Sequence, residues 1–226
     1  MCPAAPRRAP PITATVPIDP LELPEYGPVI PVIVIERLEQ AVPLARALVA
    51  GGVRVLEVTL RSPVALACIE AIARAVPEAI VGAGTLRSAA DLRAAAAAGS
   101  RFGVSPGYRP ELSQAGRDAA LPLLPGVATA SEVMAASADG HRLLKFFPAA
   151  AAGGVPMLRA FAGPFPDLAF CPTGGIDAGN ARQYLALPNV KLCGGSWLTP
   201  PDALAAGDWA RVTALARAAA ALRQAS

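Results

Sequence analysis

The chain has 226 residues, of which 54% are hydrophobic and 16% charged, and its formal net charge is +3. This length and apolar content fit one compact domain, and the small charge comes from scattered arginines rather than a basic stripe, so nucleic acid is not an expected partner. No segment reaches the roughly 18 uninterrupted apolar residues that a membrane span needs, so no membrane partner is expected either.

The N-terminal stretch is rich in proline and alanine, from Met1 to Glu25. No apolar segment follows Arg7 and Arg8, so a signal peptide is not expected. We therefore predict that residues 1–27 form a flexible or loosely docked extension, and that residues 28–226 form a single domain.

From residue 28 onward, short strand-like runs alternate with helical stretches, which is typical of βα units around a parallel sheet. The predicted strands are Val29–Ile35, Val53–Thr59, Ala79–Ala83, Arg101–Val104, Leu121–Leu124, Leu143–Phe147, Leu168–Cys171 and Val190–Cys193. The predicted helices begin near Leu38, Pro63, Ser88, Arg109, Thr129, Gly154, Asp177 and Pro201.

Helix boundaries carry their own signals. Ser62 before Pro63, Ser88 and Asp177 are predicted capping residues, and Gly51-Gly52 and Gly99 mark helix ends. Eight strands paired with eight helices favour a closed (β/α)8 TIM barrel, because a closed barrel has no edge strands. No GxGxxG motif follows the first strand, which argues against a dinucleotide-binding fold.

In such a barrel the active site lies at the carboxyl ends of the strands. The second strand brings Glu57, Thr59 and Arg61 to one face by its period of two. Later strand ends carry Thr85 and Pro106. We expect these side chains to converge on one mouth of the barrel.

Two pairs of glycines follow the last two predicted strands. Gly174-Gly175 and Gly194-Gly195 let backbone N–H groups approach an anion, and Thr173 and Ser196 add hydroxyl donors. One such pair is an ordinary tight turn. Two pairs at consecutive strand ends favour a phosphate site, which barrels often build there.

One lysine, Lys145, lies within an otherwise apolar predicted strand, with Phe147 on the same face. It either sends its amine out to water along the strand end or holds it in the barrel beside Arg61. In the second case desolvation and the neighbouring guanidinium disfavour the ammonium form, and the amine becomes a nucleophile for a carbonyl. Arg61 and Thr85 would then hold a carboxylate, and Glu57 would move protons.

Metal ligands are scarce. Cys2, Cys68, Cys171 and Cys193 form no CxxC motif, and His141, the single histidine, lies at the opposite end of its strand from the predicted site. We expect no metal and no other cofactor. Unpaired cysteines are typical of a reducing compartment, so we expect a cytoplasmic protein.

The motifs EVTLR, VGAGT, SPG, KFFPA, CPTGGI and GGSW occur in this order, and together they resemble 2-keto-3-deoxy-6-phosphogluconate (KDPG) aldolases. The resemblance spans roughly Pro28 to Arg217. It implies a class I, Schiff-base lyase that cleaves KDPG to pyruvate and D-glyceraldehyde 3-phosphate, usually as a homotrimer. The chain departs from the family in its longer N-terminal extension and in the alanines at Ala149 to Ala152, where family members often carry an acidic residue.

The resemblance also implies a role for each matching residue. The Schiff-base lysine is Lys145 and the acid/base residue is Glu57. The remaining implied contacts are Arg61 and Thr85 for the pyruvyl carboxylate, Pro106 and Phe147 for its apolar part, and Thr173, Gly174, Gly175, Gly194, Gly195 and Ser196 for the phosphate.

Two alternatives stay open. The same chemistry on 2-dehydro-3-deoxy-6-phosphogalactonate or 4-hydroxy-2-oxoglutarate needs the same amine and acid. A non-catalytic barrel that binds phosphosugars would keep the glycine loops, but it has no use for a buried amine next to an acid.

Overall fold

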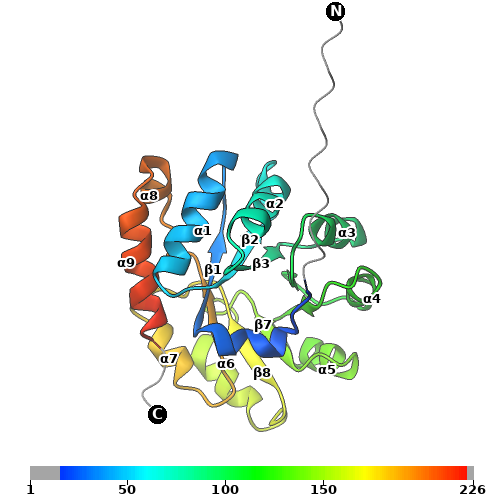
Figure 1. The fold of residues 1–226 in the computed structure, drawn as a ribbon. Helices are drawn as coiled ribbons and strands as arrows, with labels where there is room; N and C mark the ends of the chain where they lie inside the picture. Colours follow the sequence, from blue (N-terminus) through cyan, green and yellow to red (C-terminus); the bar gives the residue numbers. More distant parts are fainter. Residues whose placement is uncertain (1–15, 223–226) are drawn as a thin grey trace, which may run out of the picture.

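Strands and helices alternate along the chain (Figure 1). The structure is a computed structural model that describes residues 16–222. The strands are β1 (Val29–Ile33), β2 (Val55–Thr59), β3 (Ile80–Gly84), β4 (Gly103–Val104), β5 (Leu123–Leu124), β6 (Gly126–Val127), β7 (Leu143–Phe146), β8 (Ala169–Pro172) and β9 (Cys193–Gly195). The α-helices are α1 (Ala41–Ala50), α2 (Ala65–Ala75), α3 (Ala89–Ala97), α4 (Pro110–Asp118), α5 (Ala130–Ala138), α6 (Gly154–Phe161), α7 (Ala181–Leu185), α8 (Pro201–Ala206) and α9 (Trp209–Ala220).

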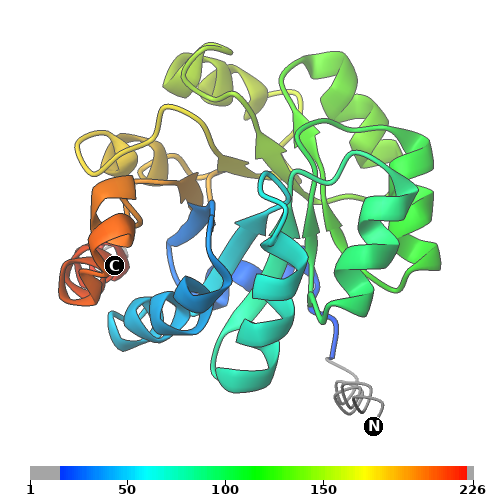
Figure 2. The ribbon, with the colours of Figure 1, turned by 90° about the horizontal axis from the view of Figure 1, so that it is seen from above.

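The paired strands all run parallel, in two sheets. Six strands form one sheet in the order β5-β4-β3-β2-β1-β9, and three form a smaller sheet in the order β6-β7-β8. Isolated parallel bridges join Phe170 to Val190 and Thr173 to Gly194, so the smaller sheet approaches β9. Figure 2 shows the helices arranged around the outside of the strands. The predicted parallel βα organisation is confirmed. The hydrogen-bonded strands form two sheets, so the closed barrel stays a prediction.

The predicted strand Leu121–Leu124 is replaced by two short ones, β5 and β6, separated by Pro125. Proline has no N–H group and cannot continue a ladder of hydrogen bonds. Each half pairs with a different neighbour, β5 with β4 and β6 with β7. The carbonyl of Pro125 still accepts a hydrogen bond from the backbone N–H of Lys145 at 2.9 Å.

The two faces of the strands bury different side chains. Leu56 and Val58 of β2 pack into the cluster that the helices cover, whereas Val55 points to the opposite, interior face. By the period of two, Glu57 and Thr59 share that interior face. The interior apolar cluster takes side chains from most strands in turn: Ile30, Val55, Ile80, Phe102, Val104, Leu124, Leu143, Ala169, Cys171 and Leu192.

A short 3-10 helix, η1 (Pro20–Tyr26), covers the start of the strands, and Figure 1 shows it as the dark blue segment below them. Leu23 is fully buried and Ile18 nearly so, and both belong to the interior cluster. The N–H of Ile18 also donates to the carbonyl of Arg101 at 3.0 Å. This part of the predicted extension is therefore packed against the strands, while residues 1–15 lie outside the described residues.

Helix starts follow the capping signals in part. Ser88 caps α3 as predicted, with its hydroxyl accepting the N–H of Asp91 at 3.1 Å. The prediction for Ser62 is wrong, because its hydroxyl donates to the carbonyl of Ile35 at 2.6 Å and α2 begins later. The prediction for Asp177 is also wrong, because its carboxylate accepts two N–H groups of a turn that precedes α7. Within residues 16–222, no helix has the length and apolar character to cross a membrane.

Candidate active site

Lys145 of β7 and Glu57 of β2 meet on the interior face of the strands. The Nζ atom of Lys145 donates to Oε1 of Glu57 at 3.2 Å, and the two side chains are only 7% and 4% exposed. The prediction that the lysine points inward is confirmed, and the alternative with its amine in water is wrong. Burying two charges costs several kcal/mol for each ion unless the pair is well compensated, and such pairs gather at functional sites.

Phe147 connects this pair to the surface. Its ring centroid lies 5.2 Å from the Nζ atom of Lys145, within the range of a cation–π contact. The same ring lines a cavity of about 660 Å³, a size typical of small-molecule sites. Lys145 and Glu57 do not line this cavity, but Phe147 contacts Lys145 and also lines the cavity.

The cavity gathers many of the predicted binding residues. Arg61, Phe147, Thr173, Gly174, Gly175, Gly195 and Ser196 all line it. Thr85, Pro106 and Gly194 do not. Gly194 still lies beside the site, because it forms a parallel bridge with Thr173. The two glycine loops that follow β8 and form the end of β9 are therefore neighbours, as the sequence predicts.

The loop after β8 needs its glycines. Gly174 has a φ of +98° and Gly175 a φ of +73°, a region that glycine adopts without the steric penalty of a side chain. Beside them, the hydroxyl of Thr173 donates to the carbonyl of Cys171 at 3.4 Å. The loop thus turns sharply at the cavity wall.

Arg61 is held over the cavity by a short chain of hydrogen bonds. Its Nε atom donates to the hydroxyl of Thr59 at 3.1 Å, and that hydroxyl donates to the carbonyl of Ile33 at 2.8 Å. Thr59 therefore orients the guanidinium. The sequence argument placed Arg61 beside Lys145, whereas the contact that the structure shows for this amine is with a carboxylate.

Thr85 directly follows β3 and has a φ of +64°. A β-branched residue with positive φ is a steric outlier that costs on the order of 1–3 kcal/mol and is found chiefly at functional sites. This backbone strain is an independent reason to associate Thr85 with the site.

The sequence argument missed the loop after the first strand. Val34, Glu36, Arg37 and Gln40 line the cavity, and the Gln40 amide donates to the carbonyl of Leu204 at 2.8 Å. The signal was available, because the rule that sites lie at strand ends applies to the first strand as much as to the second.

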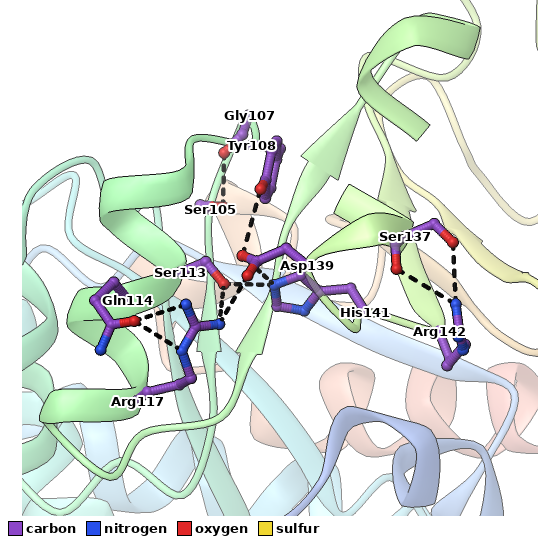
Figure 3. Close-up of polar contacts among 10 residues, drawn as sticks. All are labelled: Ser105, Gly107, Tyr108, Ser113, Gln114, Arg117, Ser137, Asp139, His141 and Arg142. Carbon is purple, nitrogen blue, oxygen red and sulfur yellow. Dashed lines mark hydrogen bonds and ion pairs between the residues drawn. The ribbon is translucent and has the colours of Figure 1, made fainter. Parts of the chain in front are cut away.

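His141 lies away from this site, at the start of β7, in a polar cluster between α4 and α5 (Figure 3). Its Nε2 atom is 2.8 Å from the hydroxyl of Ser113. Arg117 donates to that hydroxyl and to Asp139, each at 3.1 Å, and Tyr108 donates to Asp139 at 3.3 Å. Burial lowers the pKa of His141.

The described cysteines are buried free thiols, Cys68, Cys171 and Cys193. Burial raises the pKa of Cys171 to about 12, so its thiol stays protonated at neutral pH. Cys2 lies outside the described residues. Among residues 16–222, no group of three or more histidine, cysteine, aspartate or glutamate side chains could hold a metal ion.

Comparison with known proteins agrees with the resemblance that the sequence motifs show. The family model for KDPG and KHG aldolases matches residues 22–215. The chain is 54% identical to 2-dehydro-3-deoxy-phosphogluconate aldolase of Pseudoalteromonas atlantica over 195 residues, which cover 86% of this chain and 91% of that protein. It is 56% identical to the KHG/KDPG aldolase of Escherichia coli K12 over 193 residues, which cover 85% and 91%.

A solved structure gives the same result. KDPG aldolase of Legionella pneumophila, with pyruvate captured at low pH as a covalent carbinolamine intermediate, matches with a TM-score of 0.88 at 49% identity. The match covers 90% of this chain and 98% of that one. The similarity therefore extends over both the strands and the loops of the site.

Proposed function

We propose that this chain, which belongs to the KDPG and KHG aldolase family, cleaves KDPG reversibly to pyruvate and D-glyceraldehyde 3-phosphate through a Schiff base on Lys145. The observation that carries the proposal is the buried hydrogen bond between Lys145 and Glu57, 3.2 Å long, next to a cavity lined by glycine loops. An amine paired with a carboxylate in a dry interior has both a nucleophile and a proton acceptor in place.

Imine formation uses both members of the pair. Glu57 takes a proton from the ammonium form of Lys145, and the free amine adds to the C2 ketone to give a carbinolamine. Glu57 then returns the proton to the C2 hydroxyl, which leaves as water, and a protonated imine remains. The Legionella relative, in which pyruvate is captured as a carbinolamine, supports this sequence of steps.

Cleavage follows from the charge on the imine. The protonated imine accepts the electron pair of the C3–C4 bond while Glu57, through a water molecule, takes the proton of the C4 hydroxyl. Glyceraldehyde 3-phosphate leaves, and the enamine on Lys145 is protonated at C3. Hydrolysis of the resulting imine releases pyruvate and restores the amine.

We assign the binding roles by the family resemblance. Arg61 and Thr85 hold the pyruvyl carboxylate, and Pro106 and Phe147 contact its apolar part. The cavity wall supports Arg61 and Phe147 in these roles, and the strained backbone supports Thr85. The phosphate is assigned to Thr173, Gly174, Gly175, Gly194, Gly195 and Ser196.

A second substrate is favoured by one relative. The Escherichia coli protein is named a KHG/KDPG aldolase, so 4-hydroxy-2-oxoglutarate is a candidate side substrate. The glycine loops and Ser196 favour a phosphorylated substrate over this dicarboxylate. Comparing kcat/KM for KDPG, its galactonate epimer and 4-hydroxy-2-oxoglutarate decides which epimer is preferred and whether the unphosphorylated compound is a substrate.

The deciding experiment is reduction with borohydride in the presence of pyruvate, followed by peptide mapping. The chain has two lysines, Lys145 and the exposed Lys191, whose Nζ donates to the carbonyl of Pro188 at 3.1 Å. The adduct is expected on Lys145 alone, and a Lys191→Arg variant should trap pyruvate as the wild type does. An adduct on Lys191, or binding of KDPG without turnover, would contradict the proposal and favour a non-catalytic binding protein.

Four properties belong to the same proposal. The two sheets form one closed (β/α)8 barrel, supported by the bridges from β8 towards β9 and by the adjacency of β5 and β6. Residues 1–27 precede a single catalytic domain at 28–226.

The assembly is a homotrimer, as the family resemblance implies, which sedimentation analysis would test. The compartment is the cytoplasm, supported by free buried thiols.

A further inference from the structure

The interior face of β3 carries glycines where the neighbouring strands carry side chains. A Cβ atom built on Gly82 would lie 2.5 and 2.6 Å from two ring carbons of Phe102. A Cβ atom built on Gly84 would lie 2.7 and 2.8 Å from the Cγ and Cδ atoms of Glu57, and nearer still to its Oε1 atom. Real side chains do not approach so closely in a packed interior. At these two positions the absence of a side chain on β3 leaves space that Phe102 and Glu57 occupy.

The crowded atom at Gly84 is the one that holds the amine. Glu57 lies opposite Gly82 in the register of the two strands, and its side chain leans along the strand towards Gly84, the next interior position. Its Oε1 atom both contacts the bare backbone of Gly84 and accepts the hydrogen bond from Lys145. Oε1, Cγ and Cδ are all affected, so an added methyl group would turn the carboxylate as a whole.

We propose that Gly84 is a positioning residue for the aldol reaction: its missing side chain lets the Glu57 carboxylate reach the Lys145 amine. This inference rests on the proposed function. It assigns Gly84 no contact with substrate, since it acts through Glu57. Gly84 does not line the cavity, whose wall is formed by Arg61 and the glycine loops. The pair that Gly84 positions is therefore separate from the cavity wall.

The separation predicts a specific kinetic signature. In a Gly84→Ala variant the displaced carboxylate no longer relays protons to and from the amine, and such relays contribute on the order of 10²–10⁴-fold to rates. Substrate binding at the cavity wall is retained. We expect kcat to fall on the order of 10²-fold, with little change in KM.

A matched control is Gly103→Ala on β4. Gly103 is also a buried strand glycine, but its added Cβ would meet chiefly the end of the flexible Leu86 side chain, at 2.7 Å. This variant introduces a similar methyl group into the apolar cluster that the helices cover, without touching Glu57. We expect its kcat to stay close to that of the wild type.

A double-mutant cycle with Glu57→Asp tests the mechanism directly. The aspartate is shorter by one methylene group, so the alanine methyl has room beside it. Gly84→Ala should lower kcat on the order of 10²-fold when Glu57 is present and less than about threefold in the Glu57→Asp background. Losses that simply multiply would indicate general damage to the fold and overturn the inference.

The two proposals fail in different ways. If the wild type neither cleaves KDPG nor traps pyruvate on Lys145, the proposed function fails. If the wild type does both and Gly84→Ala has an unchanged kcat, only the positioning role fails. Should Gly84→Ala not fold, Gly84→Ala with Glu57→Asp makes room for the added methyl group, keeps a carboxylate beside the Lys145 amine, and is expected to recover a native circular dichroism spectrum and cooperative melting. Failure of that double variant to fold overturns the inference.

Discussion

Two polar clusters lie on different sides of the strands, and they differ in how their polar groups are satisfied. The inner pair, Lys145 and Glu57, joins two buried charges by one hydrogen bond of 3.2 Å. The outer cluster of Figure 3 spreads its charge over several partners, since Asp139 alone accepts from Arg117 and Tyr108. A lysine ammonium has three donors, so the inner amine keeps capacity for another group.

This contrast distinguishes a reactive site from a structural one. The outer cluster links α4 to the end of α5 through several hydrogen bonds, which stabilise their packing. A buried ion pair is weak evidence for stability, and on the proposed function the unused capacity of this pair serves its chemistry. Both clusters contain ionisable side chains, and residue type alone does not tell them apart.

The largest expected effect comes from removing the inner amine. Lys145→Met keeps much of the side-chain volume but has no nucleophile, so kcat for KDPG cleavage should fall by about 10⁴-fold or more. A coupled assay for pyruvate measures it, with circular dichroism as the check on folding. Turnover within tenfold of the wild type would show that the inner pair is structural too.

Changing the inner acid should have a smaller effect. Glu57→Gln keeps the shape and can still contact the amine, but it cannot take a proton. We expect kcat to fall on the order of 10²–10⁴-fold, while borohydride still traps pyruvate on Lys145 at a reduced rate. Equal trapping and turnover in the variant and the wild type would remove Glu57 from the mechanism.

The outer cluster should respond in stability and not in catalysis. Arg117→Ala leaves Asp139 and Ser113 with one partner fewer, and because Arg117 is half-exposed this should lower the free energy of unfolding by about 0.5–1.5 kcal/mol and leave kcat unchanged. Denaturant unfolding measures the first and the coupled assay the second. Arg109→Ala is the matched control, since its ion pair with Glu111 is 3.4 Å long and exposed and should contribute at most about 1 kcal/mol. A loss of activity in Arg117→Ala would break the distinction between the clusters.

The smallest expected effect is a pH dependence of stability from His141. Burial lowers its pKa in the folded protein, so below the ordinary value of about 6.5 the unfolded chain binds more protons, and acidification favours unfolding. The melting temperature should therefore fall between pH 7.5 and 5.5. Asp139 contributes at lower pH, because its hydrogen bond from Ser113 and the charge of Arg117 outweigh burial and lower the pKa of its carboxyl. A His141→Gln variant should show a flatter pH dependence, and an equal slope would assign the effect elsewhere.

Much of the fold follows from local patterns. The period of two in β2 and β7 correctly placed Glu57 and Lys145 on interior faces, and Ser88 correctly marked the start of α3. The division of one predicted strand at Pro125 depends on which neighbour each half pairs with. The local sequence around Pro125 does not specify these pairing partners.

The site shows the same limit. Strand ends indicated that Glu57 and Arg61 both lie near Lys145, but only the structure shows that the amine contacts Glu57, 88 positions away in the chain. Spacing along a strand predicts a face, while the rotation of one strand against another decides which atoms touch. The role of Gly84 is harder still to foresee, because a missing side chain has meaning only once its neighbour is known.

The buried segment at Ile18 and Leu23 bears on how substrate enters and products leave the site. The segment packs into the interior cluster at the start of the strands, whereas the cavity is lined by Phe147 and the glycine loops at their carboxyl ends. On the proposed function, substrate therefore enters from the side of Phe147. The glyceraldehyde 3-phosphate part of the substrate then lies nearer the glycine loops, and the pyruvyl part is bonded to the buried Lys145. Because the pyruvyl part stays bonded to Lys145 until the imine is hydrolysed, the aldehyde departs first and pyruvate last, so pyruvate should act as a competitive product inhibitor.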